Sequence, residues 1–196
     1  MPCGGFSIAR SRTIAAEVDR DALCVRPALP QDLAAIQSVY APAVTRGLAS
    51  FEEEAPSVDE MLRRYAEVVG RGLPYFVAER GGEVVGYGYC THYRTRSAYR
   101  YVLEDSVYVR EGLGGSGIGS ALLAQLIHAA EGLGYRQMIA VIGDSGNSAS
   151  IRLHARFGFL RVGTLRSAGF KLGRWVDSVL MQRPLGPGDS RPPDDA

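Results

Sequence analysis

Apolar residues recur every three or four positions in four stretches of the chain, the spacing of one face of an α-helix. These stretches begin at Pro30, Ser57, Ile118 and Ala149. The second opens with Ser57-Val-Asp-Glu60, which has the spacing of a capping box, and it ends at Gly70. The pattern therefore predicts four helices.

Runs rich in β-branched and aromatic residues alternate with these stretches and predict strands. Gly81-Gly82 separates two of the runs with the spacing of a two-residue hairpin turn, so we expect these two strands to pair antiparallel. The run that ends at Val109 is expected to join them as a third antiparallel strand. The runs cover residues 23–26, 75–80, 83–90, 100–109, 137–142, 159–165 and 175–181.

The length of 196 residues fits one domain with tails. Residues 1–22 show no sustained periodicity and residues 186–196 are rich in Pro, Gly and Asp, so both are predicted to be flexible, leaving a domain over 23–185. Hydrophobic residues make up 46% and charged residues 22%, close to globular averages, which excludes a wholly disordered, collagen-like or coiled-coil chain.

The charge balance and the cysteines narrow the function classes further. The formal net charge is +1, so no overall field favours nucleic acid or an anionic membrane. Three cysteines without metal-ligand or CxxC spacing argue against a disulfide scaffold, a zinc site or a redox motif, and no metal is expected. No stretch approaches the roughly 18 apolar residues of a membrane span, and the N-terminus lacks the apolar core of a signal peptide. We therefore expect a cytoplasmic protein.

A glycine-rich loop joins the strand ending at Val109 to the helix that follows. Four glycines in the loop allow backbone N–H groups to approach a ligand at the positive end of a helix dipole, which suits an anion such as a pyrophosphate: Gly114, Gly115, Gly117 and Gly119. A flexible connection is the alternative, because glycine loops alone are weak signals. Gly112 to Gly117 also satisfies G-x-G-x-x-G, with Asp144 after the next strand, as in dinucleotide-binding oxidoreductases. The antiparallel hairpin before the loop argues against that rival, since such a site opens a βαβ unit.

Four further motifs place the loop in a recognisable setting: Tyr87-Gly-Tyr89 with Arg94-Thr-Arg96-Ser-Ala-Tyr99-Arg100; Val102-Leu-Glu104-Asp-Ser-Val-Tyr-Val109; Val141-Ile142 through Asn147-Ser-Ala-Ser150-Ile-Arg-Leu-His154; and Gly163-Thr-Leu-Arg166 through Gly169-Phe170-Lys171 to Trp175 and Asp177. With them, residues 23–185 resemble the GCN5-related N-acetyltransferase (GNAT) superfamily, and within it the phosphinothricin and methionine sulfoximine acetyltransferases. The resemblance implies an α/β (α+β) GNAT fold, with a central mixed, mostly antiparallel sheet of about six to seven strands flanked by about four helices. The chain departs from the superfamily pattern [QR]-x-x-G-x-[GA] at its first position, which is Gly114.

The resemblance implies acetyl-CoA as co-substrate. The residues that would bind it are the strand segment Val107, Tyr108 and Val109, the loop residues Gly115, Ser116, Gly117, Ile118, Gly119 and Ser120 through their amides, and Asn147. Asn147 also suits the N-cap of the helix near Ala149, and one residue can fill both roles.

Acetyl transfer to an amine needs a base for the amine proton and a donor for the developing oxyanion. Glu104 is the predicted base, because it lies in an otherwise apolar strand where partial burial would raise its pKa, and it matches the family's glutamate. His154 matches a family histidine and is the second catalytic candidate, with packing in the core as its alternative role. The N–H of Val107 is the candidate oxyanion donor, and Tyr108 is a weaker candidate for protonating the leaving thiolate.

An acceptor with a carboxylate is expected, because three arginines lie in the turn before the Glu104 strand and guanidinium groups bind carboxylates in pairs of hydrogen bonds; a solvated basic turn is the alternative. The family pattern places acceptor contacts at Arg94, Thr95, Arg96, Glu104, Asp105 and Ser106, with Phe51, Tyr89 and Lys171 as further candidates for the pocket wall.

The sequence therefore predicts an acetyl-CoA-dependent N-acetyltransferase that acts on the α-amine of a small amino acid or analogue (phosphinothricin, methionine sulfoximine or methionine sulfone) by direct attack in a ternary complex. Two alternatives stay open: a GNAT enzyme acting on a polyamine or a protein N-terminus, and a non-catalytic CoA-binding sensor. The resemblance also implies a homodimer, with Trp175 and the last strands as candidate interface.

Overall fold

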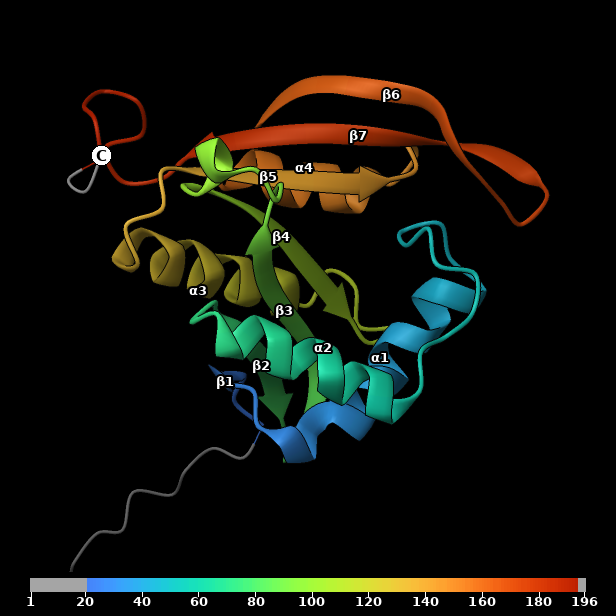
Figure 1. Ribbon diagram of the computed structural model, residues 1–196. Coiled ribbons are helices and arrows are strands. Elements are labelled where there is room, and N and C mark those ends of the chain that lie inside the picture. Colours follow the sequence, from blue (N-terminus) through green and yellow to red (C-terminus); the bar gives the residue numbers. More distant parts are fainter. Residues whose placement is uncertain (1–20, 194–196) are drawn as a thin grey trace, which may run out of the picture.

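A seven-stranded sheet forms the centre of the computed structural model, which describes residues 21–193 (Figure 1). The strand order is β1-β2-β3-β4-β5-β7-β6, and in this described part of the chain only β4 and β5 pair in parallel. The predicted mixed, mostly antiparallel sheet is confirmed. The strands are β1 (Cys24–Pro27), β2 (Tyr75–Arg80), β3 (Glu83–His92), β4 (Val102–Val109), β5 (Gln137–Gly143), β6 (Leu160–Lys171) and β7 (Arg174–Pro184).

Four α-helices flank the sheet within residues 21–193, as expected: α1 (Leu33–Thr45), α2 (Val58–Gly70), α3 (Ile118–Gly132) and α4 (Ser148–Arg156). The Ser57 side chain caps α2 by accepting a hydrogen bond from the Glu60 N–H, which confirms the capping signal. Two short 3-10 turns precede α1 and β4. Pro30–Asp32 stands where the sequence pattern predicted the start of the first helix, and Ser97–Tyr99 lies in the turn before the predicted third strand. The turn at Ser97–Tyr99 delays the start of β4 from residue 100 to Val102.

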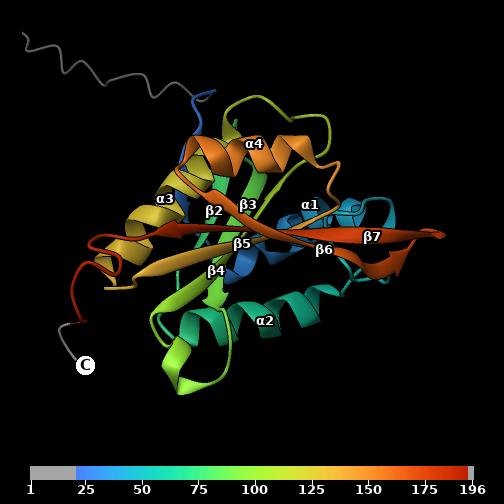
Figure 2. The same ribbon diagram turned by 90° about the horizontal axis from the view of Figure 1, so that it is seen from above.

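The helices divide between the two faces of the sheet (Figure 2). On one face, the Tyr40 ring of α1 meets the rings of Tyr87 and Tyr108 edge-on. On the other face, α3 packs so closely that a Cβ on Gly88 would lie 3.0 Å from a methyl of Leu126. Since side chains alternate between faces along a strand, neighbouring residues of β4 are directed to different helices, and this alternation decides the positions of the site residues.

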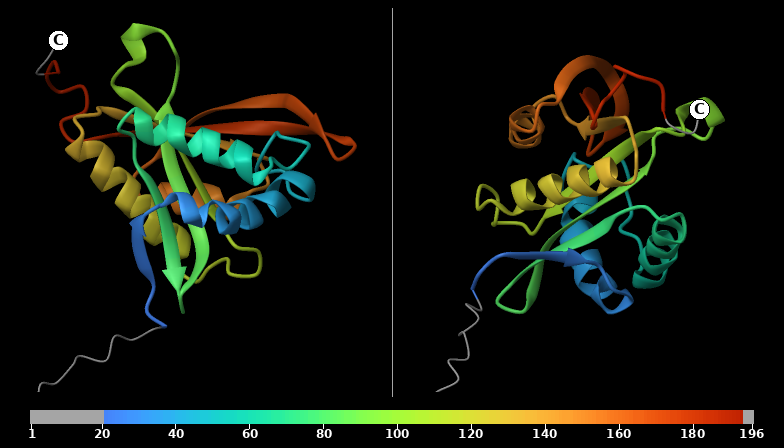
Figure 3. Two further views of the ribbon diagram at one scale, coloured as in Figure 1. Left: turned by 60° about the horizontal axis from the view of Figure 1, so that its bottom comes forward. Right: turned by 90° about the vertical axis from the view of Figure 1, so that its left-hand side faces the viewer.

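The last two strands form a ribbon whose far end extends beyond the rest of the sheet (Figures 1 and 3). The sequence pattern predicted strands over 159–165 and 175–181, but β6 continues to Lys171 and β7 to Pro184. The part of β6 that the sequence pattern did not predict, after residue 165, contains Ser167. This residue has a φ of 51° and lies within a register shift between Leu165 and Gly169. Such an irregularity interrupts the two-residue alternation, so the pattern ends before the strand does.

Both ends of the chain extend beyond the described residues. Of the predicted N-terminal extension over residues 1–22, residues 1–20 lie outside the described part, and at the other end so do residues 194–196. The segment 186–193 lies against Arg136, whose guanidinium donates to the carbonyls of Gly188 and Pro192, while the predicted flexibility of the tail stays a prediction. In the described residues, no helix has both the length and the apolar character needed to cross a bilayer.

Candidate active site

A cleft opens where β4 and β5 separate. Their pairing runs from Val102 with Gln137 only to Asp105 with Ala140, after which β5 continues alongside β7. Two hydrogen bonds, from Tyr93 N–H to Val102 O and from Arg110 N–H to Val85 O, show which residues along β4 direct their backbone N–H and C=O groups toward β3. By this alternation the N–H and C=O groups of Val107 and Val109 are directed away from β3, on the side that β5 has left. The cleft wall is therefore a strand edge with free backbone groups.

The glycine loop and the start of α3 form the lower end of this cleft. Gly117 adopts a φ of 86° as the N-cap of α3, and Gly115 a φ of 80°, conformations that favour glycine. Gly115, Gly117, Gly119 and Ser120 line the cleft. Ile118 is buried in the core and the Ser116 hydroxyl donates to the Leu113 carbonyl, so these two predicted residues can contribute only their amides. The loop presents the N-terminal amides of a helix to the cleft, as the sequence predicted.

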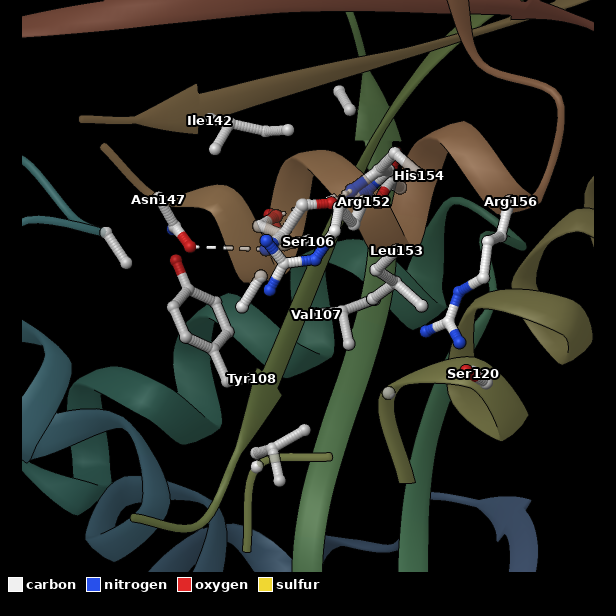
Figure 4. A pocket seen from close by; sticks show the side chains of 18 of the residues that line it. Ser106, Val107, Tyr108, Ser120, Ile142, Asn147, Arg152, Leu153, His154 and Arg156 are labelled. Atoms are coloured by element: carbon white, nitrogen blue, oxygen red, sulfur yellow. Dashed lines mark hydrogen bonds and ion pairs between the residues drawn. The ribbon is translucent and has the colours of Figure 1, made fainter. Parts of the chain in front are cut away.

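Helix α4 forms the opposite wall, and the cleft between the walls has a volume of about 880 Å³ (Figure 4). Asn147 lines it and caps α4, since its side-chain oxygen accepts a hydrogen bond of 3.2 Å from the Ser150 N–H. Asn147 therefore fills the predicted N-cap role with its side-chain oxygen. The predicted hydrogen bond to a ligand is compatible with this role and stays a prediction. Arg152 and Arg156 extend from the same helix at the mouth of the cleft. The sequence analysis missed both arginines, although their spacing of four on a helix places them on one side.

Glu104 lies in β4 on the face covered by α1 and α2. Its strand partner Thr91 lies beside it on β3, and Ser106 follows on the same face two residues later. Burial raises the pKa of the Glu104 carboxyl, the negative charge of Asp105 adds to the rise, and the charge of Arg94 opposes it. The structure thus gives Glu104 the half-buried surroundings that suit a base working near neutral pH.

The predicted acceptor-binding residues do not all come together. Arg94, Thr95 and Arg96 lie exposed in the loop between β3 and β4, and the Arg94 guanidinium lies 4.9 Å from the centre of the Tyr93 ring. Arg94 is near enough for its charge to act on Glu104. Asp105, however, points to the opposite face of the sheet and is 5% exposed, so its side chain is separated from Glu104 and Ser106 by the strand itself.

His154 occupies a buried position in α4. Its Nε2 lies 3.0 Å from Oδ2 of Asp105, and its Nδ1 lies 2.8 Å from the Ser150 carbonyl oxygen. Burial opposes protonation of the imidazole, but the hydrogen bond and charge of Asp105 and the bond to Ser150 outweigh it, so the pKa of His154 is raised. Because both ring nitrogens are engaged, neither is free to take a proton from an acceptor amine. The geometry favours the core role that the sequence left as the alternative to catalysis.

A polar network that the sequence did not indicate lies next to Tyr108. The Tyr40 hydroxyl lies 2.8 Å from the Ser50 hydroxyl and donates to Glu52, whose carboxylate accepts from Arg64 at 2.7 Å. The ring of Tyr40 meets that of Tyr108 edge-on, with centroids 4.8 Å apart. Burial is the main cause that raises the pKa of Tyr40 to about 12 and that of Tyr108 well above its ordinary value. Both phenols are therefore protonated at neutral pH, as a proton donor must be.

The three further candidates for the acceptor pocket have different positions. Tyr89 is half-buried in β3, opposite Ser106. Phe51 packs over Gly169, so closely that a Cβ on that glycine would overlap its ring. Lys171 is buried and donates to the Ser50 carbonyl at 2.6 Å, so it holds the segment after α1 against β6. Burial lowers the pKa of this ammonium group.

Within residues 21–193, no three His, Cys, Asp or Glu side chains lie close enough together to hold a metal ion.

Comparison with known proteins matches residues 35–159 to the Acetyltransferase (GNAT) family. The chain belongs to the GNAT family. The family is a family of N-acetyltransferases, and this chain is accordingly an N-acetyltransferase. It is 53% identical over 181 residues to the phosphinothricin N-acetyltransferase of Alcaligenes faecalis, an alignment that covers 92% of each chain. It is 37% identical over 163 residues to the L-methionine sulfoximine/L-methionine sulfone acetyltransferase of Salmonella typhimurium, covering 83% of this chain and 95% of that one. Within the GNAT family the chain groups with these acetyltransferases.

A solved GNAT structure shares the fold described above. The phosphinothricin acetyltransferase of Sinorhizobium meliloti, crystallised in complex with acetyl-CoA, superposes with a TM-score of 0.85 at 43% sequence identity, covering 89% of this chain and 94% of that one. The predicted GNAT fold is confirmed, and acetyl-CoA is the molecule that this relative binds.

Proposed function

We propose that this enzyme transfers the acetyl group of acetyl-CoA to the α-amine of a small amino acid of the phosphinothricin and methionine sulfoximine class. The relatives with these substrates in their names support the acceptor class. The observation that carries the proposal is the arrangement around β4, in which Glu104 faces one side of the sheet while the amides of Val107 and Val109 are free beside the cleft. The proposed base and the proposed thioester site are thus only a few residues apart on the same strand.

The cleft residues would hold acetyl-CoA in an extended form. Val107 and Val109 would pair with the pantetheine arm as an added strand, with Asn147 donating from the other wall. The amides at the start of α3 would bind the pyrophosphate, and Arg152 and Arg156 would neutralise part of the phosphate charge. Acetyl-CoA would supply the activated thioester, and the Val107 N–H would donate to its carbonyl oxygen as negative charge develops.

Glu104 would accept the proton of the acceptor amine, so that the neutral amine attacks the thioester directly. Its raised pKa makes the carboxylate a stronger base than an exposed glutamate. The high pKa of Tyr108 suits it as the donor of a proton to the departing thiolate. Arg94 and Arg96 would bind the acceptor carboxylate.

We also infer that the enzyme forms a homodimer through the β6–β7 ribbon. Six large apolar side chains are exposed there: Leu160, Val162, Leu165, Phe170, Leu172 and Trp175. Phe170 and Trp175 meet edge-on at 5.3 Å and are 57% and 66% exposed. Exposed apolar clusters of this kind mark interaction surfaces in proteins that are otherwise polar outside.

The decisive experiment measures thiol release from acetyl-CoA with phosphinothricin, methionine sulfoximine, methionine sulfone, the protein amino acids, polyamines and an N-terminal peptide as acceptors. We expect turnover on the amino-acid analogues and little on polyamines, because the acceptor loop is basic. Faster turnover on a polyamine or a peptide would overturn the proposed amino-acid class of acceptor in favour of that compound's class. CoA binding without turnover on any acceptor would favour the sensor alternative.

A further inference from the structure

The buried pair of Asp105 and His154 joins the central sheet to α4 behind the cleft. The two side chains are 1% and 5% exposed, and the bond between Oδ2 and Nε2 is 3.0 Å long. Three of the described residues face the pair. Cys90 of β3 is the strand partner of Asp105, Ser150 presents its backbone carbonyl and its hydroxyl to His154, and the ring of Phe159 lies edge-on to the imidazole.

The hydrogen-bond partners determine where protons can lie. A backbone carbonyl only accepts, so His154 must carry a hydrogen on Nδ1 to bond Ser150. A single further proton then lies between Nε2 and Oδ2, whichever atom holds it, and the pair has no net charge. The other carboxylate oxygen of Asp105, Oδ1, is buried and makes no hydrogen bond within residues 21–193. An unbonded buried oxygen costs free energy, so the pair is not optimised for stability alone.

The position of the pair connects it with ligand binding. Asp105 is the last residue of β4 that pairs with β5, so it stands where the two strands separate. His154 lies in the last turn of α4, the helix that Asn147 caps and that forms the opposite wall. The bond therefore spans the cleft at its closed end and fixes the position of one wall relative to the other.

We propose that Asp105 and His154 are positioning residues, which hold α4 against β4 so that Asn147 and the free edge of β4 are the right distance apart to bind acetyl-CoA. This inference rests on the proposed function, because it assumes that the cleft takes the cofactor. It assigns the pair a role in cofactor affinity and none in proton transfer to or from the substrates.

Titration of CoA by calorimetry tests the proposal without turnover. We expect Asp105→Ala and His154→Ala each to weaken CoA binding at least tenfold, and the double variant to be no weaker than either single one, because both remove the same bond. Asp105→Asn should bind within threefold of the unaltered protein. Its amide can donate to the bare Nε2 of a neutral His154 whose Nδ1 still bonds Ser150.

The matched control is Cys90→Ala, which removes a buried side chain beside the pair. It should lower the melting temperature and leave the CoA affinity unchanged. Equal CoA affinity in all variants overturns the proposal, and so does a loss in Cys90→Ala as large as that in Asp105→Ala. Failure of the unaltered protein to bind CoA would instead overturn the proposed function.

Nitrogen-15 NMR of the unaltered protein keeps the proposal testable if the alanine variants do not fold. The chain has three histidines, so few signals need assignment. Nδ1 of His154 should carry a proton at every pH between about 6 and 9, as expected for a ring held by Ser150 and Asp105. An unprotonated Nδ1 at neutral pH would overturn the geometry on which the proposal stands.

Discussion

At the residue scale, the adjacent acids Glu104 and Asp105 have opposite surroundings because a strand directs them to opposite faces. Glu104 is half-buried near Arg94, whereas Asp105 is buried and bonded to His154. Their charges still interact through the strand, since Asp105 contributes to the raised pKa of Glu104. The family resemblance places Asp105 among the expected acceptor contacts, but the alternation of side chains directs its carboxylate to the opposite face of the sheet.

Glu104→Gln removes the proposed base and leaves a side chain of the same shape. We expect kcat to fall about 10²- to 10⁴-fold, the range that a positioned base contributes, with an unchanged melting temperature. In the unaltered enzyme, activity requires the ionised carboxylate. Activity should therefore fall as the pH decreases through a pKa above the ordinary glutamate value of about 4.3. Steady-state rates between pH 5 and 9 measure both effects, and a variant with full activity would exclude Glu104 as the base.

Arg94→Ala removes a positive charge that lowers the pKa of Glu104. The pKa should rise further, so the acidic limb of the kcat/KM profile should move to higher pH and the KM for the acceptor should increase. Arg100→Ala is the control, because Arg100 lies over the Tyr101 ring in the same loop and is not among the charges that shift the pKa of Glu104. If both variants shift the limb equally, the effect comes from the loop charge as a whole.

At the element scale, the strand, glycine loop and helix that begin the cleft follow directly from the sequence. The turn at Gly81-Gly82, the cap at Ser57 and the helix after Gly117 are short-range signals, and the structure confirms all three. The separation of β4 from β5 and the Tyr40–Glu52–Arg64 network could not be predicted in this way. They depend on which strands become neighbours and on contacts between residues that are distant in the chain.

Gly114 and Gly115 are neighbours in the loop but differ in backbone conformation. Gly115 has a φ of 80°, whereas Gly114 has no positive φ, and a Cβ at either site meets open space. Gly114→Gln should therefore be tolerated and bind CoA several-fold more tightly, because the side-chain amide adds a donor for phosphate.

Gly115→Gln is the matched comparison, because the left-handed conformation costs a non-glycine residue roughly 1–2 kcal/mol. It should bind CoA more weakly. Calorimetric dissociation constants for the two variants decide the point, and weaker binding by Gly114→Gln would contradict the prediction.

At the scale of the whole molecule, the β6–β7 ribbon leaves large apolar side chains outside the main body of the fold (Figure 3). Trp175→Asp places a charge in the proposed dimer interface and should give a monomer by size-exclusion chromatography with light scattering. Leu133→Asp is the control, because Leu133 is also exposed but follows α3, outside the ribbon. A dimer that persists in Trp175→Asp would move the interface elsewhere.

The separation of β4 from β5 leaves the protein with an unfinished sheet. Strand edges that lack a partner exchange their amide hydrogens with water quickly and are open to pairing with foreign chains. The amides of Val107 and Val109 should therefore exchange rapidly in the free enzyme and become protected when CoA is added, and the melting temperature should rise with CoA concentration. In this protein the pantetheine arm of the cofactor would act as the missing strand, so that supply of the cofactor and protection from aggregation become the same event.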